Sequence, residues 1–107
     1  MSKKHFVAIH TCSSKEGRRA FIDLTKGLTH QELVESCRTE SAEMIAQWMG
    51  KDDFFYCHWY ADGEEAIHEV LENLGVDKIC VTAVNEMSRY VTKQNLSSKL
   101  VGDPDNE

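Results

Sequence analysis

The spacing of apolar residues changes along the chain between the two-residue period of strands and the longer period of helices. Residues 5–12 alternate, residues 54–60 read FFYCHWY, and residues 79–84 form an apolar, β-branched run. The aromatic run is too short for a stable isolated helix, and its side chains suit a pleated surface. We therefore expect a strand in each of these three stretches.

Two helices are expected between the first two of these strands. Residues 16–24 place apolar side chains at helical offsets, and Ser13 or Ser14 can cap that helix. Thr29 and Glu32 have the spacing of a capping box, in which each residue satisfies a backbone N–H near the other. This pair predicts that a second helix begins at residue 29.

A further helix is expected over residues 63–74. Asp62 as N-cap and Glu65 three places later form an acidic variant of the capping box, and acidic side chains suit the positive end of a helix dipole. Gly75 stands where a left-handed C-cap is expected. Together with its flanking strands, this helix forms a strand-helix-strand unit.

Residues 40–49 fit two templates. Met44, Ile45 and Trp48 could form one side of a helix, yet the same short apolar run also suits a strand. Residues 50–53 read GKDD, which suits a four-residue turn before the aromatic strand. We therefore favour a hairpin over a continued helix.

With this hairpin, the order is strand, helical segment, strand, strand, helix, strand, which is the split βαβ pattern of a ferredoxin-like α+β domain. We expect an antiparallel sheet whose first and third strands are central neighbours, with helices on one face. The bare face should meet a partner, which predicts a homodimer that pairs sheet to sheet. Residues 1–92 are expected to form this domain, and residues 93–107 a polar C-terminal tail.

The composition narrows the classes of partner and compartment. A net charge of -6, from 18 acidic and 12 basic residues, argues against nucleic-acid binding, which needs a basic face. No apolar run approaches the ~20 residues that span a bilayer, and no secretory signal is visible, so we expect no membrane association. The four cysteines lack CxxC or zinc-knuckle spacing, as expected of reduced thiols in a cytoplasmic protein.

Alternation along the first strand divides its side chains between two faces. His5, Val7, Ile9 and Thr11 lie on one side of this strand, and we expect that side to face the helices. His10 and Cys12 would then lie on the uncovered face of the sheet.

The same reasoning places Tyr56, His58 and Tyr60 on one face of the aromatic strand. Their polar tips suit a wet cavity or an interface, so we expect them to bind a small-molecule ligand. Because the first and third strands are central neighbours, His10 and His58 are expected to share this face. His10 therefore completes the predicted ligand-binding set.

Two imidazoles near each other allow several kinds of chemistry. With the thiolate of Cys12, His10 and His58 could hold a divalent transition metal such as nickel, zinc or copper. Either histidine could instead act as a general acid or base, since its ordinary pKa lies near neutrality. A third interpretation is that both histidines form hydrogen bonds across a polar dimer interface.

Residues 27–87 also resemble a known group of proteins. GLTHQEL opens a helix, FYCHWYADGEEAI joins an aromatic strand to the next helix, and LGVDKICVTAV closes the sheet. In this the chain resembles small, mostly uncharacterised ferredoxin-like proteins related in shape to dimeric α/β-barrel proteins, some of which are described as nickel-binding. Residues 17–26 and the chain after Met87 have no counterpart in that group.

The resemblance implies a dimeric α/β barrel and leaves three functions open. The first is a homodimeric module that binds a small ligand or a metal ion. The second is a cofactor-independent monooxygenase or isomerase that uses His10 or His58 as acid or base. The third is a structural or interaction domain.

Overall fold

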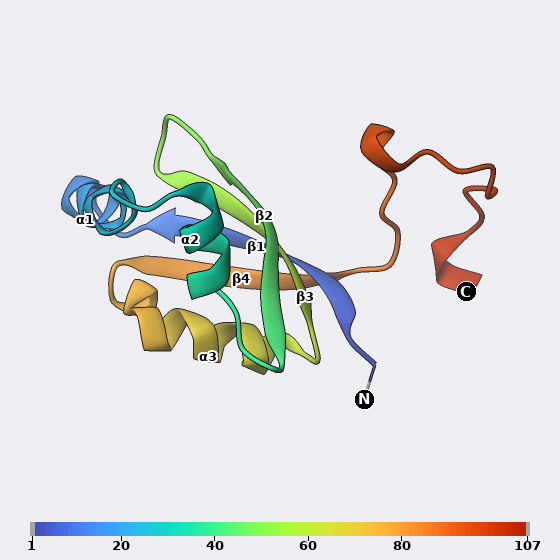
Figure 1. Ribbon diagram of the computed structural model, residues 1–107, viewed down its shortest axis with the longest axis horizontal. Helices are drawn as coiled ribbons and strands as arrows, with labels where there is room; N and C mark the ends of the chain where they lie inside the picture. The colour runs from blue at the N-terminus through green and yellow to red at the C-terminus, as the bar shows by residue number, and fades with distance from the viewer. Residues whose placement is uncertain (1, 107) are drawn as a thin grey trace.

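The computed structural model describes residues 2–106 and shows an α+β fold built around one antiparallel sheet (Figure 1). Its strands are β1 (Lys4–Cys12), β2 (Ala42–Met49), β3 (Phe54–Ala61) and β4 (Cys80–Met87). Its α-helices are α1 (Lys15–Thr25), α2 (His30–Ser36) and α3 (Glu64–Leu74). Short 3₁₀ helices span Val76–Lys78, Lys93–Asn95 and Pro104–Asn106. The strands and α-helices expected from the sequence are all present.

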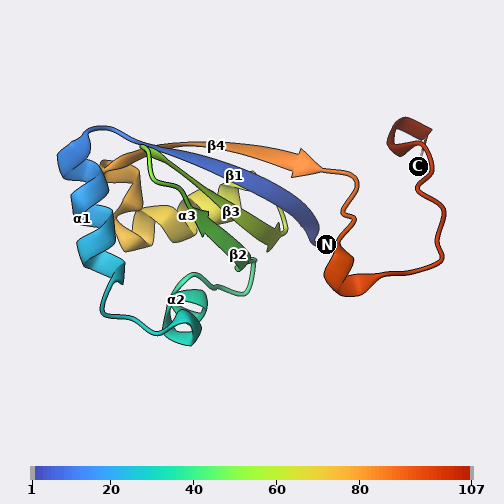
Figure 2. The ribbon, with the colours of Figure 1, turned by 90° about the horizontal axis from the view of Figure 1, so that it is seen from above.

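The strand order is β2-β3-β1-β4, and each strand runs antiparallel to its neighbours. The three described α-helices lie on the same side of this sheet, and the other side is uncovered (Figure 2). β1 and β3 are central neighbours, as the sequence predicts. The arrangement is compatible with a ferredoxin-like split βαβ fold, in which α2 is an additional short helix before β2.

The ambiguous segment is a strand, which confirms the hairpin. β2 pairs with β3 from Ala42 opposite Ala61 to Met49 opposite Phe55, and a register shift falls between Met44 and Ala46. Arg18 of α1 also donates hydrogen bonds to backbone carbonyls of the turn at residues 50 and 52. The hairpin turn is thus tied to the first helix.

The start signals of α1 and α2 are confirmed. The side chain of Ser14 accepts a hydrogen bond from the backbone N–H of Gly17 at 2.9 Å. Thr29 and Glu32 form both hydrogen bonds of the capping box, at 3.0 and 2.9 Å. These caps explain why each helix begins where the sequence indicates.

The predicted N-cap of α3 is wrong. Gly63, which has no side chain to form a cap, occupies that position instead of Asp62. The backbone N–H of Asp62 donates to the carbonyl of Ser41 at 2.8 Å, and this hydrogen bond ties Asp62 to the residue that precedes β2. The predicted C-cap is confirmed, because Gly75 has a φ of 78°, a left-handed conformation that favours glycine.

The predicted orientation of β1 is also wrong. Phe6, Ala8, His10 and Cys12 face the helices, and each is at most 5% exposed. In β3, the buried set facing the helices is Phe55, Cys57 and Trp59, as the register opposite β1 requires. β1 is a central strand with apolar residues on both sides, so alternation alone does not identify its core face.

The uncovered side of the sheet, called the open face below, is defined by the strand register. It consists of His5, Val7, Ile9, Thr11, Glu43, Ala46, Trp48, Phe54, Tyr56, His58, Tyr60, Val81, Ala83, Asn85 and Met87. Trp48, Phe54 and Val81 are among the large apolar side chains exposed on it.

After β4 the chain leaves the sheet and extends away from it (Figures 1 and 2). Apart from the two short 3₁₀ helices, the described part of this segment has no regular structure, and most of it is exposed. Within residues 2–106, no helix is both long enough and apolar enough to cross a membrane.

Candidate functional site

A cavity of about 230 Å³ lies between the sheet and its helices. Apolar side chains from α1, α2 and α3 line one side of it, and the helix-facing residues of the sheet line the other. The residues contributed by the sheet are His10, Met44, Gln47, Phe55, Cys57 and Trp59. The cavity is therefore an apolar space with a few polar groups at its wall.

His10 is the most unusual of these groups because it is fully buried. Its Nδ1 lies 2.7 Å from Oγ1 of Thr82, which is directly opposite on β4. Its ring stacks on Phe55, with ring centroids 4.3 Å apart and planes 18° apart. One hydrogen bond and one stacked ring thus hold the imidazole in a single orientation.

Burial also determines the charge of His10. Removal from water disfavours the imidazolium and lowers the pKa of His10 to about 4, and the charge of His68 adds a smaller effect in the same direction. The side chain is consequently neutral near pH 7. A neutral imidazole has one nitrogen that donates and one that accepts.

Two side chains that line the cavity each carry an unsatisfied polar atom. Within the described chain, Nε2 of His10 and Nε1 of Trp59 are buried and have no hydrogen-bond partner. Each buried polar group without a partner costs about 1–3 kcal/mol, so most proteins avoid leaving two beside one cavity.

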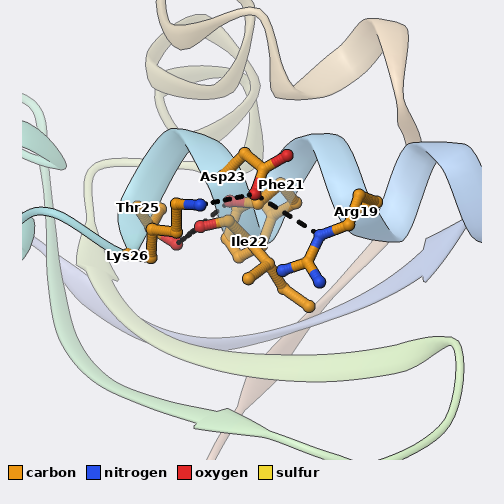
Figure 3. A network of polar contacts seen from close by, with 6 residues as sticks. All are labelled: Arg19, Phe21, Ile22, Asp23, Thr25 and Lys26. Atoms are coloured by element: carbon orange, nitrogen blue, oxygen red, sulfur yellow. Dashed lines mark hydrogen bonds and ion pairs between the residues drawn. The ribbon is translucent and has the colours of Figure 1, made fainter.

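The other polar side chains of the wall have partners. The hydroxyl of Thr25 donates to the carbonyls of Phe21 and Ile22 on its own helix (Figure 3). Ser36 donates to the carbonyl of Leu33, and the amide of Gln47 points to sulfur atoms. Among these residues, His10 and Trp59 are therefore the ones that carry a buried, unsatisfied polar atom.

A second cluster lies on the open face. Nδ1 of His5 is 2.9 Å from Nε2 of His58, and both rings lie near Tyr90, which follows β4. The ring of Tyr60 lies 4.8 Å from that of His5. Burial lowers the pKa of His58, and the nearby charge of His5 lowers it further. This pair lines a shallow hollow of about 140 Å³.

The structure separates the predicted ligand-binding set. Tyr56, His58 and Tyr60 share the open face, whereas His10 lies on the opposite face beneath the helices. The prediction that His10 and His58 share a face is therefore wrong, because it depended on the reversed orientation of β1.

The predicted metal ligands do not fit a metal ion. His10 and Cys12 face the helices, and His58 lies on the other side of the sheet. Among the described residues, no group of three or more His, Cys, Asp or Glu side chains could hold a metal. The cavity instead presents one imidazole and one indole in apolar surroundings, which is a poor donor set for a cation.

Sequence reasoning missed three residues of these sites. His5, Thr82 and Trp59 were treated only as members of their strands. Trp59 did carry a signal, because a buried indole usually finds a partner for its N–H. The pairing of His10 with Thr82 depends on the register between β1 and β4, which no local pattern in the sequence reveals.

Comparison of the chain with protein-family models, with curated proteins and with solved structures finds no match.

Proposed function

We propose that this protein is a binding module that takes a small, mostly apolar ligand into the cavity between sheet and helices. One observation carries the proposal: Nε2 of His10 and Nε1 of Trp59 are buried and unsatisfied, and both side chains line the same apolar cavity. A ligand with suitably placed polar groups would satisfy both atoms. Pockets of this kind, apolar with a few placed polar groups, are typical of small-molecule sites.

The cavity also limits the chemistry of the ligand. An engineered apolar cavity of about 150 Å³ accepts benzene, so about 230 Å³ suits a single ring with short substituents. The indole N–H of Trp59 only donates, so the ligand needs an acceptor. A hydroxyl group both donates and accepts, and it can therefore pair with either nitrogen. These properties point to a substituted phenol or a similar small alcohol.

The state of His10 supports binding more than acid-base catalysis. A general base works best when its pKa lies near the operating pH, and burial lowers the pKa of His10 to about 4. Such an imidazole is a weak base at neutral pH but a good hydrogen-bonding group. We therefore assign it to ligand recognition, with Thr82 fixing its orientation.

We also propose that the open face pairs with a second copy of this chain. Glu43 is the one Asp, Glu, Lys or Arg residue among the strand residues on this face, although the whole chain carries 30 residues of these four types. Interface cores are depleted of charge and enriched in aromatic residues. Two copies of an acidic protein can therefore meet here without bringing many like charges together.

Titration with 4-ethylphenol tests the ligand site. We expect it to raise the melting temperature and to shift the NMR signal of the Trp59 indole N–H, whereas ethylbenzene, which lacks the hydroxyl, should bind about tenfold more weakly. His10→Phe and Trp59→Phe should each weaken binding of 4-ethylphenol by a similar factor.

Trp48→Phe is the matched control, because Trp48 lies on the open face and should leave the affinity unchanged. Equal affinity for 4-ethylphenol and ethylbenzene, or equal affinity in wild type and both cavity variants, would contradict the proposed site.

A further inference from the structure

Cys12 and Cys80 form a pair in the core that does not line the proposed ligand cavity. They are direct partners in the β1–β4 ladder, both are buried, and their Sγ atoms lie 3.7 Å apart. Both are free thiols. Two cysteines from distant parts of the chain thus lie within contact distance.

The register makes this pair suitable for a disulfide. The backbone N–H of Ser13 donates to the carbonyl of Ile79, one position beyond the cysteines. Cys12 and Cys80 are therefore a non-hydrogen-bonded pair of the antiparallel ladder. In such non-hydrogen-bonded pairs the Cα atoms are about 4.5 Å apart, within the range of roughly 4.4–6.8 Å that disulfides span. Bridging the two sulfur atoms therefore needs little movement of either strand.

We propose that Cys12 and Cys80 are a redox-active pair that forms a reversible disulfide between β1 and β4. With a low-molecular-weight disulfide such as oxidised glutathione, the thiolate of one cysteine attacks a glutathione sulfur, and one glutathione thiolate leaves. The second cysteine then attacks the mixed disulfide, and the second glutathione leaves. Both cysteines lose a proton, the protein loses two electrons, and one glutathione disulfide becomes two thiols.

The hydrogen bond between the thiols suggests the order of attack. The S–H of Cys80 donates to Sγ of Cys12, and burial raises the pKa of Cys80 to about 12. Cys80 therefore keeps its proton in the folded protein. This assigns Cys12 to the first attack. Cys80 carries out the closing step after glutathione on Cys12 has displaced the hydrogen bond between the two thiols.

Access comes from the position of the pair in the sheet. Cys12 is the last residue of β1, Cys80 is the first residue of β4, and β4 is an edge strand. Strand ends at a sheet edge open more readily than the centre of the ladder. Oxidation should accordingly be slow, and its rate should depend on how often the end of β1 and the start of β4 separate locally.

The remaining thiols have a different setting. Cys57 lies on β3 and Cys37 follows α2, so they are not partners across a ladder. Burial raises the pKa of Cys57 to about 12, and its sulfur accepts a weak hydrogen bond from the amide of Gln47. These two cysteines provide matched controls, because both are buried.

The test is prolonged incubation of the native protein with oxidised glutathione, followed by alkylation, mass spectrometry and peptide mapping. We expect the free thiols to fall from four to two, with a peptide that links Cys12 to Cys80. Reduction should restore all four. Because the link closes a long loop, the melting temperature should rise on the order of 10 °C.

Variants separate the two steps. Cys37→Ser and Cys57→Ser should retain the link, whereas Cys80→Ser should accumulate a mixed disulfide with glutathione on Cys12. Four free thiols after oxidation, a link between Cys37 and Cys57, or a link between two chains would each overturn the proposal. Peptide mapping of the wild-type protein gives this answer even where a variant does not fold. None of these outcomes depends on ligand binding in the cavity.

Discussion

Nδ1 of His5 lies 2.9 Å from Nε2 of His58, so two imidazoles meet directly on the open face. The contact crosses the β1–β3 ladder diagonally, since His5 is the partner of Tyr60 and His58 the partner of Val7. At such a distance a proton on one ring opposes a second proton on the other. A charge on His5 therefore lowers the pKa of His58, in addition to the effect of burial.

Removing one imidazole should change the titration of the other. We expect His5→Gln to raise the pKa of His58, because the opposing charge disappears while the burial that also lowers this pKa remains. NMR titration of the imidazole signals measures the change. His30→Gln is the control, since His30 is exposed on α2 and should leave the titration of His58 unaltered. If the pKa of His58 stays constant or falls in His5→Gln, the charge of His5 does not act on His58.

His10 should make the protein less stable in acid. Its pKa is about 4 in the folded state and about 6.5 when unfolded, so the unfolded chain takes up this proton first as the pH falls. The stability that depends on neutral His10 is therefore fully present above about pH 6.5. It falls as the pH is lowered toward 4, where the free energy of unfolding has decreased by about 3 kcal/mol.

Urea unfolding of wild type and His10→Gln across this pH range measures that contribution. The variant should be less stable at neutral pH but should lose less stability on acidification. His30→Gln should keep the wild-type dependence. If the free energy of unfolding depends on pH in the same way in wild type and His10→Gln, the acid sensitivity does not come from His10.

The hydroxyl of Thr82 should stabilise the fold through His10. Thr82→Val keeps the shape of the side chain but removes the partner of Nδ1, so both nitrogens of a fully buried imidazole become unsatisfied. We expect a loss of about 1–3 kcal/mol in the free energy of unfolding. Thr11→Val makes the same chemical change on the opposite face of the sheet, where the hydroxyl has no contact with the His10 ring, and its effect should be smaller. Similar losses in the two variants would argue against a special role for the Thr82 hydroxyl.

Gly17 allows α1 to pack closely against the chain that precedes β4. A Cβ atom at this position would lie 2.9 Å from the backbone carbonyl oxygen of Ile79, too close for an ordinary contact. We expect Gly17→Ala to destabilise the protein by about 1–3 kcal/mol, because backbone must move to relieve the overlap. Gly27→Ala is the control, since its Cβ would meet nothing within 4 Å. Equal stability of the two variants in chemical denaturation would contradict this account.

A charge on the open face should prevent the proposed dimer. Trp48 is 59% exposed on this face, and Trp48→Glu would place a carboxylate within the apolar contact. We expect light scattering to give twice the mass of the chain for wild type and a single mass for this variant. Leu100→Glu is a matched control, because Leu100 is exposed in the C-terminal segment. A wild-type protein that is monomeric at micromolar concentration would refute the dimer.

Local signals in the sequence predicted most of the elements. The capping box of α2, the left-handed Gly75 after α3 and the aromatic strand β3 all depend on neighbouring residues, and all three are confirmed. The start of α3 was predicted one residue too early. There the backbone of Asp62 bonds to Ser41, a contact that no local pattern reveals.

The faces of the strands were harder to predict. β3 has a polar-tipped side and an apolar side, so its alternation identified the correct sets. β1 presents apolar residues on both sides, and its orientation was predicted in reverse, which moved His10 to the wrong face and removed His5 from consideration. A single reversed strand was enough to misplace the predicted metal and ligand set.

By itself the sequence determined the order of elements and the hairpin, because propensity, capping and periodicity act over a few neighbouring positions, and it singled out some of the residues capable of chemistry. The tertiary structure decided which of those residues meet. The register of β1 against β3 and β4 places His5 beside His58, His10 beside Thr82 and Cys12 beside Cys80. Those pairings join distant parts of the chain, and a shift of one residue in register would exchange every face.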